Sequence, residues 1–117
     1  MNIVVLQGKL TRAPEERTLP SGDRLVTYEV TTRLADGEAA SAPVAWADPP
    51  AAALDLDEGD EVAVVGYIRR RFFRVGGVTQ SRTEVVAREV VPRRRRAQVG
   101  RALAKAIDQL SDPGGGG

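Results

Sequence analysis

Residues 61–73, EVAVVGYIRRRFF, decide the fold, because they form the longest strand pattern in the chain. Side chains of a β-strand point alternately to its two faces. One face carries Val62, Val64, Gly66 and Ile68, and the other carries Ala63, Val65, Tyr67, Arg69, Arg71 and Phe73. Residues 75–78, VGGV, predict a hairpin tip, and residues 79–91 predict the returning strand. The segment therefore predicts a hairpin that presents arginines and an aromatic ring together, unless a bulge follows Arg70.

Three shorter strands and a short helix precede this hairpin. Their β-branched composition and alternation predict strands over residues 2–10, 25–33 and 42–46. Asp48 is expected to cap a short helix over residues 49–56, since Pro is accepted in a first helical turn. This order of elements predicts an all-β fold, a five-stranded Greek-key OB barrel with a short helix between strands 3 and 4. An SH3-like barrel has a similar order.

The composition excludes most enzyme chemistries. The 117 residues include no cysteine and no histidine, which removes disulfides, thiolate nucleophiles, Cys/His metal sites and imidazole catalysis. The densest carboxylates, at residues 55–61, stand on a turn without a nucleophile. We therefore expect no enzyme activity, no cofactor and no bound metal. The chain has no signal sequence and no apolar run of ~20 residues, so we expect a cytoplasmic, nucleoid-associated protein without membrane contact.

The net charge of +1 conceals two opposite halves of the chain. Residues 1–66 contain 5 basic and 12 acidic groups, a net charge of −7, whereas residues 67–117 contain 12 and 4, a net charge of +8. Such a division indicates a surface that binds a polyanion. One alternative is a basic tail that is simply solvated. Another is that the block Arg93–Arg96 pairs with the acidic N-terminal half of the chain.

The last 25 residues differ from the rest and are treated as a tail, residues 93–117, after a domain at residues 1–92. The tail begins with the basic block Arg93–Arg96 and ends with four glycines, which predict a flexible end. Between them, an apolar stripe at helical spacing comprises Val99, Ala102, Leu103, Ala106, Ile107 and Leu110. A helix this short is marginal alone in water, so we expect it to dock on another surface.

Several motifs are similar to those of the bacterial single-stranded DNA-binding protein family. They are residues 8–10 (GKL), 14–17 (PEER), 20–22 (PSG), 44–46 (VAW), 58–73 and 83–86 (TEVV). The chain therefore resembles a divergent or accessory member of that family over residues 1–92. The resemblance implies an OB fold, a homo-oligomer that is a dimer or a tetramer, and binding of single-stranded DNA without sequence readout.

The resemblance also implies the site residues. Trp46 and Phe73 occupy positions of base-stacking aromatics, and Arg69 and Arg71 those of phosphate-binding arginines. Stacking on an aromatic side chain is worth ~1–3 kcal/mol per base and tolerates any base. We add Arg74, Lys9 and Arg12 as further cations of the nucleic-acid-binding surface.

The aromatic side chains also have structural alternatives. Trp46 can belong to the core, and Phe73 can pack against its own hairpin. Tyr67 fits either role, whereas Phe72 is expected to pack.

The first strand predicts an oligomer contact. Val4 and Leu6 lie on the face expected to point into the barrel, and Ile3 and Val5 on the opposite face are apolar too. Both faces of the strand should therefore be buried against a partner. The family dimerises through this strand, and we therefore expect Ile3 and Val5 at the interface between subunits. The alternative is that the tail helix of the same chain covers them.

Two departures from the family affect the expected function. Residues 36–41 are short and acidic where the family carries stacking residues, so two platforms are missing and binding should be weaker or the footprint shorter. The chain also lacks the acidic tip through which the family recruits repair proteins, so no such recruitment is expected.

We expect sequence-independent binding of single-stranded DNA in replication, recombination or repair. The alternative is an OB module for protein–protein contact or a primosomal-type accessory factor.

Overall fold

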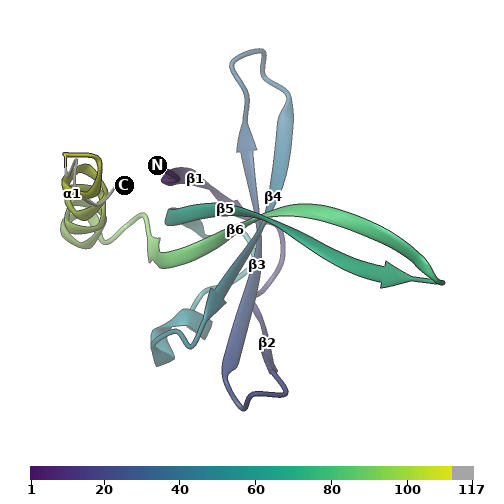
Figure 1. Ribbon diagram of the computed structural model, residues 1–117. Helices are drawn as coiled ribbons and strands as arrows, with labels where there is room; N and C mark the ends of the chain where they lie inside the picture. The colour runs from purple at the N-terminus through teal and green to yellow at the C-terminus, as the bar shows by residue number, and fades with distance from the viewer. Residues whose placement is uncertain (112–117) are drawn as a thin grey trace.

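The computed structural model describes residues 1–111 and consists of one strongly bent sheet with a helix against it (Figure 1). The strands are β1 (Val4–Leu10), β2 (Glu15–Thr18), β3 (Arg24–Arg33), β4 (Ala39–Ala47), β5 (Glu61–Val75) and β6 (Val78–Pro92). A 3-10 turn, η1 (Ala51–Leu54), connects β4 to β5, and the helix α1 (Arg96–Ser111) follows β6. The flexible glycine end predicted at residues 114–117 lies outside the described residues.

The sheet forms a nearly closed ring. The strand order is β1-β5-β6-β4-β3-β2, and β1 also pairs with β3 through Lys9 and Leu10. The β4–β6 pairing is parallel and the other pairings are antiparallel. A ring of mostly antiparallel strands, with a short helical turn before the last hairpin, is consistent with the predicted OB barrel.

Two elements differ from the sequence prediction. Strand β2 was not predicted, because all four of its side chains are exposed and its sequence shows no apolar alternation. The predicted Asp48-capped helix is wrong: the helical segment is a single 3-10 turn, and Pro50 precedes it without a side-chain cap. Asp48 instead has a φ of +48° and donates its backbone N–H to the Arg24 carbonyl, which keeps it at the end of the sheet.

The barrel interior is filled mainly by β-branched side chains. Val26, Val30, Val44, Val62 and Val64 are essentially inaccessible to solvent. Such small, stiff side chains suit a narrow barrel whose strands must twist strongly. Close strand crossings occur at Gly8 and Gly66, where a Cβ atom would collide with the Thr31 and Val86 carbonyl oxygens.

Tyr28 connects the barrel interior to η1. Its hydroxyl donates a 2.8 Å hydrogen bond to the Ala53 carbonyl oxygen inside the core. Burial raises the pKa of the Tyr28 hydroxyl above its ordinary value, because the charged form loses its hydration there.

Helix α1 docks on the outside of the barrel, as the apolar stripe in its sequence predicted. Ala102 and Ala106 are buried in a second cluster with Val65 of β5 and Val91 of β6, and Ile3 and Val99 pack against it. The two alanines permit close approach of the helix to the sheet. None of the helices in residues 1–111 is both long and apolar enough to cross a membrane.

The β5–β6 hairpin extends well beyond the barrel (Figure 1). Its register shifts once, between Val65 and Gly66: Val65 pairs with Glu89 and Gly66 with Ala87, so Arg88 is an extra residue on β6. From Gly66 to Val75 the register is regular. The bulge after Arg70 that would have separated Arg69 from Arg71 and Phe73 is therefore absent.

Candidate nucleic-acid interface

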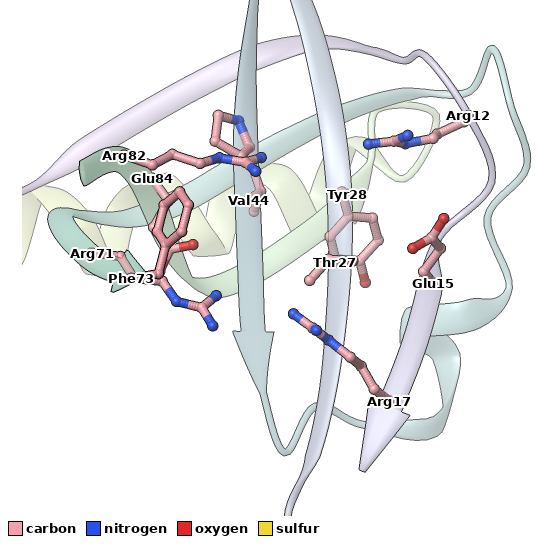
Figure 2. Close-up of a pocket in the computed structure, with 11 residues that line it drawn as sticks. Arg12, Glu15, Arg17, Thr27, Tyr28, Val44, Arg71, Phe73, Arg82 and Glu84 are labelled. Carbon is pink, nitrogen blue, oxygen red and sulfur yellow. The ribbon is translucent and has the colours of Figure 1, made fainter. Parts of the chain in front are cut away.

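The hairpin and the strands beside it enclose a groove of about 430 Å³, which we call the hairpin groove. Its lining includes four arginines, namely Arg12, Arg17, Arg71 and Arg82. It also includes two aromatic rings, those of Phe73 and of the buried core residue Tyr28. Figure 2 shows Phe73, Arg71 and Arg82 on the hairpin side, and Arg12 and Arg17 on the opposite side. The guanidinium groups of Arg71 and Arg17 point toward one another across this space (Figure 2). The volume is in the range of clefts that hold small ligands, about 300–1,000 Å³.

Arg71 and Arg82 are a like-charged pair on neighbouring strands. They lie directly opposite one another in the antiparallel ladder. Like charges in this position destabilise a sheet, and in residues 1–111 no carboxylate forms an ion pair with either guanidinium. An anion placed between them would relieve this repulsion, so their arrangement suits phosphate binding.

Two carboxylates, Glu15 and Glu84, also line the groove. Glu84 is 6% exposed and is the one buried charged residue of the described chain. It lies opposite Arg69 in the ladder, and Arg69 Nη2 donates a 2.8 Å hydrogen bond to Glu84 Oε1. Because Arg69 neutralises Glu84, the charge of this carboxylate subtracts little from that of the four arginines.

The structure brings together part of the predicted site. Phe73, Arg71 and Arg12 line the hairpin groove, and Arg69 contacts it through Glu84. Arg74 instead donates to the Gly77 carbonyl oxygen at the hairpin tip.

Lys9 lies in a separate hollow over β1 and β3.

Sequence reasoning missed Arg82 and Arg17. The position of Arg82 follows from the hairpin register, which pairs it with Arg71 around the Gly76-Gly77 tip, whereas Arg17 stands on the unpredicted β2.

Trp46 does not lie in the hairpin groove. It is half-buried, packs against the barrel core, and lines a small hollow of about 70 Å³ with residues that include Leu56, Arg94 and Arg95. This placement is the one that the core alternative describes. Base stacking on Trp46 stays a prediction.

The two remaining aromatics of the hairpin differ in their surroundings. The Arg88 guanidinium carbon lies 5.7 Å from the centroid of the Tyr67 ring, the geometry of a cation–π contact. Phe72 is 66% exposed, so the expectation that it packs is wrong. Beyond Gly66, the even-numbered side chains of β5 lie on the strand face that points into the core within the barrel. This part of β5 extends past the end of the barrel, so no core residues cover these side chains.

The predicted oligomer residues have different environments. Ile3 packs against the cluster beneath α1, as the intramolecular alternative predicted. Val5 is 51% exposed beside it.

The comparison with protein families agrees with the position of the barrel along the chain. The model of the single-strand binding protein family matches residues 1–92, from β1 through β6. Helix α1 lies beyond the match. No curated protein matches this chain.

Proposed function

We propose that this chain, which belongs to the single-strand binding protein family, binds single-stranded DNA in the hairpin groove by stacking a base on Phe73 and holding phosphates with Arg71 and Arg82. Membership of the family implies binding of single-stranded DNA, and its members are binding proteins without enzymatic activity. The groove supplies the finer mechanism of the proposal. Readout of sequence is not part of it, since stacking and phosphate contacts tolerate every base.

The observation that carries the proposal is the position of Phe73 beside Arg71 and Arg82, two arginines that form no ion pair within residues 1–111. Phe73 is half-buried, so its ring is held in place while part of it stays accessible. Arg71 lies two residues before Phe73 on the same face of β5, and Arg82 lies opposite Arg71 on β6. A base on the ring would therefore have its flanking phosphates within reach of these two cations.

The groove has a single aromatic platform besides the core tyrosine Tyr28. Each stacked base contributes about 1–3 kcal/mol, so we propose modest affinity that depends strongly on the arginines and hence on salt. A protein of this kind fits a supporting role in DNA replication, recombination or repair.

The test is a matched pair of substitutions on the hairpin. Phe73→Ala should weaken binding of fluorescently labelled oligo(dT) about 5- to 150-fold, the equivalent of one lost stacking platform. Phe72→Ala removes an identical ring from the opposite face of the same strand and should change affinity less than about 2-fold. Fluorescence anisotropy measures both. Equal effects of the two substitutions, or no effect of Phe73→Ala, would refute stacking in the groove.

Self-association through β1 is a separate part of the proposal. Val5 is apolar and 51% exposed on an outer strand, and burial of such a side chain is worth about 1.5–3 kcal/mol. Sedimentation equilibrium at micromolar concentration should give a dimer or tetramer, and Val5→Glu should shift the species toward the monomer. A monomer in the unchanged protein would rule out this contact.

A further inference from the structure

A second hollow, of about 560 Å³, lies over β1 and β3, and we call it the seam hollow because it follows their short pairing. Three cations line it: Lys9 of β1, Arg33 of β3 and Arg93, which follows β6. The Thr11 and Thr31 hydroxyls also line it, 2.6 Å apart. Its lining contains no aromatic residue. Cations and hydroxyls without a ring suit a phosphate backbone rather than a stacked base.

The seam hollow continues onto the C-terminal tail. Arg93 and Glu61 line both this hollow and a further one of about 370 Å³, whose other residues are Arg94 and Arg96. Arg93 Nη1 lies 2.9 Å from Glu61 Oε2, so this pair ties the basic block to β5. Buried Ala102 and Ala106 anchor the helix that follows. The arginines are thus held against the barrel at the end of the hollow.

The outer face of β3 connects the seam hollow to the hairpin groove. Thr27 lines the groove, whereas Thr31 and Arg33 line the hollow, and all three share one face by their spacing. Glu29 lies between them on that face and forms a 3.1 Å ion pair with Arg12 of the groove. A strand of DNA that follows β3 would therefore meet one carboxylate that is already paired.

The charge along this route far exceeds that of the whole molecule. The groove, the seam hollow and its continuation are lined by nine basic and three acidic residues, and Glu29 adds a fourth acid. The net charge of the route is therefore +5, whereas that of the chain is +1. Clustering of one sign along a continuous path is the electrostatic footprint of a nucleic-acid surface.

We infer that the seam hollow and the basic block Arg93–Arg96 form a second contact zone for the phosphates of the same DNA strand, so that the docked tail is part of the interface. This inference rests on the proposed function of the hairpin groove. If it is correct, a long DNA strand contacts both the hairpin groove and the second zone, whereas a short DNA strand contacts the groove alone.

The experiment compares oligo(dT) of about 8 and about 30 nucleotides, lengths within and beyond the site size of a single OB fold. The test variant is Arg33→Glu with Arg96→Glu. Arg33 contacts only a turn carbonyl among the described hydrogen bonds, and a carboxylate at position 96 favours the start of a helix, so folding should be retained. The control, Arg101→Glu with Lys105→Glu, makes the same charge change on exposed positions of α1 outside both zones.

The test variant should weaken binding of the long oligonucleotide about 10-fold or more and reduce its log–log salt slope by about 1.4, for two lost phosphate contacts. The short oligonucleotide, and the control with either length, should change less than about 3-fold. An equal loss of affinity for both oligonucleotide lengths, or for the test and control variants, would overturn the inference of a second contact zone. The proposed binding in the hairpin groove would still stand. If the unchanged protein binds neither length, the proposed function falls with it.

Discussion

Arg69 and Glu84 show how a single residue pair shapes the hairpin groove. Glu84 would place an uncompensated negative charge beside the proposed phosphate site if it stood alone. Arg69, which is half exposed, supplies both the counter-charge and a hydrogen bond. The role of Arg69 in this account is therefore to neutralise Glu84, and direct phosphate contact falls to Arg71 and Arg82.

Arg69→Met should lower the free energy of unfolding by about 1–3 kcal/mol, because Glu84 is then left as a buried charge without its partner. The double variant Arg69→Met with Glu84→Gln should regain most of that loss, since the charge is removed together with its partner. Urea unfolding of both variants measures the difference. A single variant as stable as the unchanged protein would show that water already solvates Glu84.

The site residues differ in how far sequence could predict them. Arg71 and Phe73 were predictable from alternation, because the hairpin is regular beyond Gly66. The core position of Trp46 also follows from spacing, since Trp46 shares a strand face with buried Val44 two residues earlier. The resemblance implies base stacking on Trp46, and this role stays a prediction, because the half-buried side chain keeps part of its surface accessible.

At the level of elements, the sequence predicted those with an apolar pattern and missed those without one. Strands β1 and β3 alternate between more and less buried side chains, whereas β5 and β6 carry apolar runs that are buried on both faces where they form the barrel. Strand β2 pairs with β3, from Glu15 opposite Thr27 to Thr18 opposite Arg24, and Glu16 forms a 2.6 Å ion pair with Arg24. Its neighbours in space, rather than its own side chains, determine its conformation.

The apolar stripe predicted α1 but not which part of it docks. The barrel contact uses Ala102 and Ala106, whereas Leu110 remains 59% exposed. The small side chains are at the contact because they let the helix backbone approach Val65 and Val91 closely. Side-chain size at an interface depends on the opposing surface, which a helical pattern does not contain.

Docking of α1 can be tested with two alanines on the same helix. Ala106→Glu introduces a charge at a position that is 3% exposed and should release the helix, which lowers the melting temperature and the helical signal in circular dichroism. Ala104→Glu makes the same change at an exposed position and should have little effect. Equal melting temperatures for the two variants would mean that the helix does not depend on this contact.

For the molecule as a whole, folding redistributes the charge that the sequence separates into two halves. Arg12 and Arg17 come from the acidic first half, yet they face Arg71 and Arg82 of the basic second half across one groove. The charge separation of the sequence therefore predicted a polyanion surface but not its composition. The fold assembles this surface, because the lining of the groove comes from β2, β3 and β4 as well as from the β5–β6 hairpin.

The most direct test of the central claim is the salt dependence of oligo(dT) binding by the unchanged protein, measured by anisotropy alongside a duplex of the same length. If single-stranded DNA binds in the hairpin groove, the logarithm of the association constant falls linearly with the logarithm of the salt concentration. The slope is about −0.7 per phosphate contact, or about −2 to −3 for the four groove arginines. The single strand should also bind more tightly than the duplex, whose paired bases cannot reach Phe73. A slope near zero, equal affinity for the duplex, or no binding at low salt would contradict this claim.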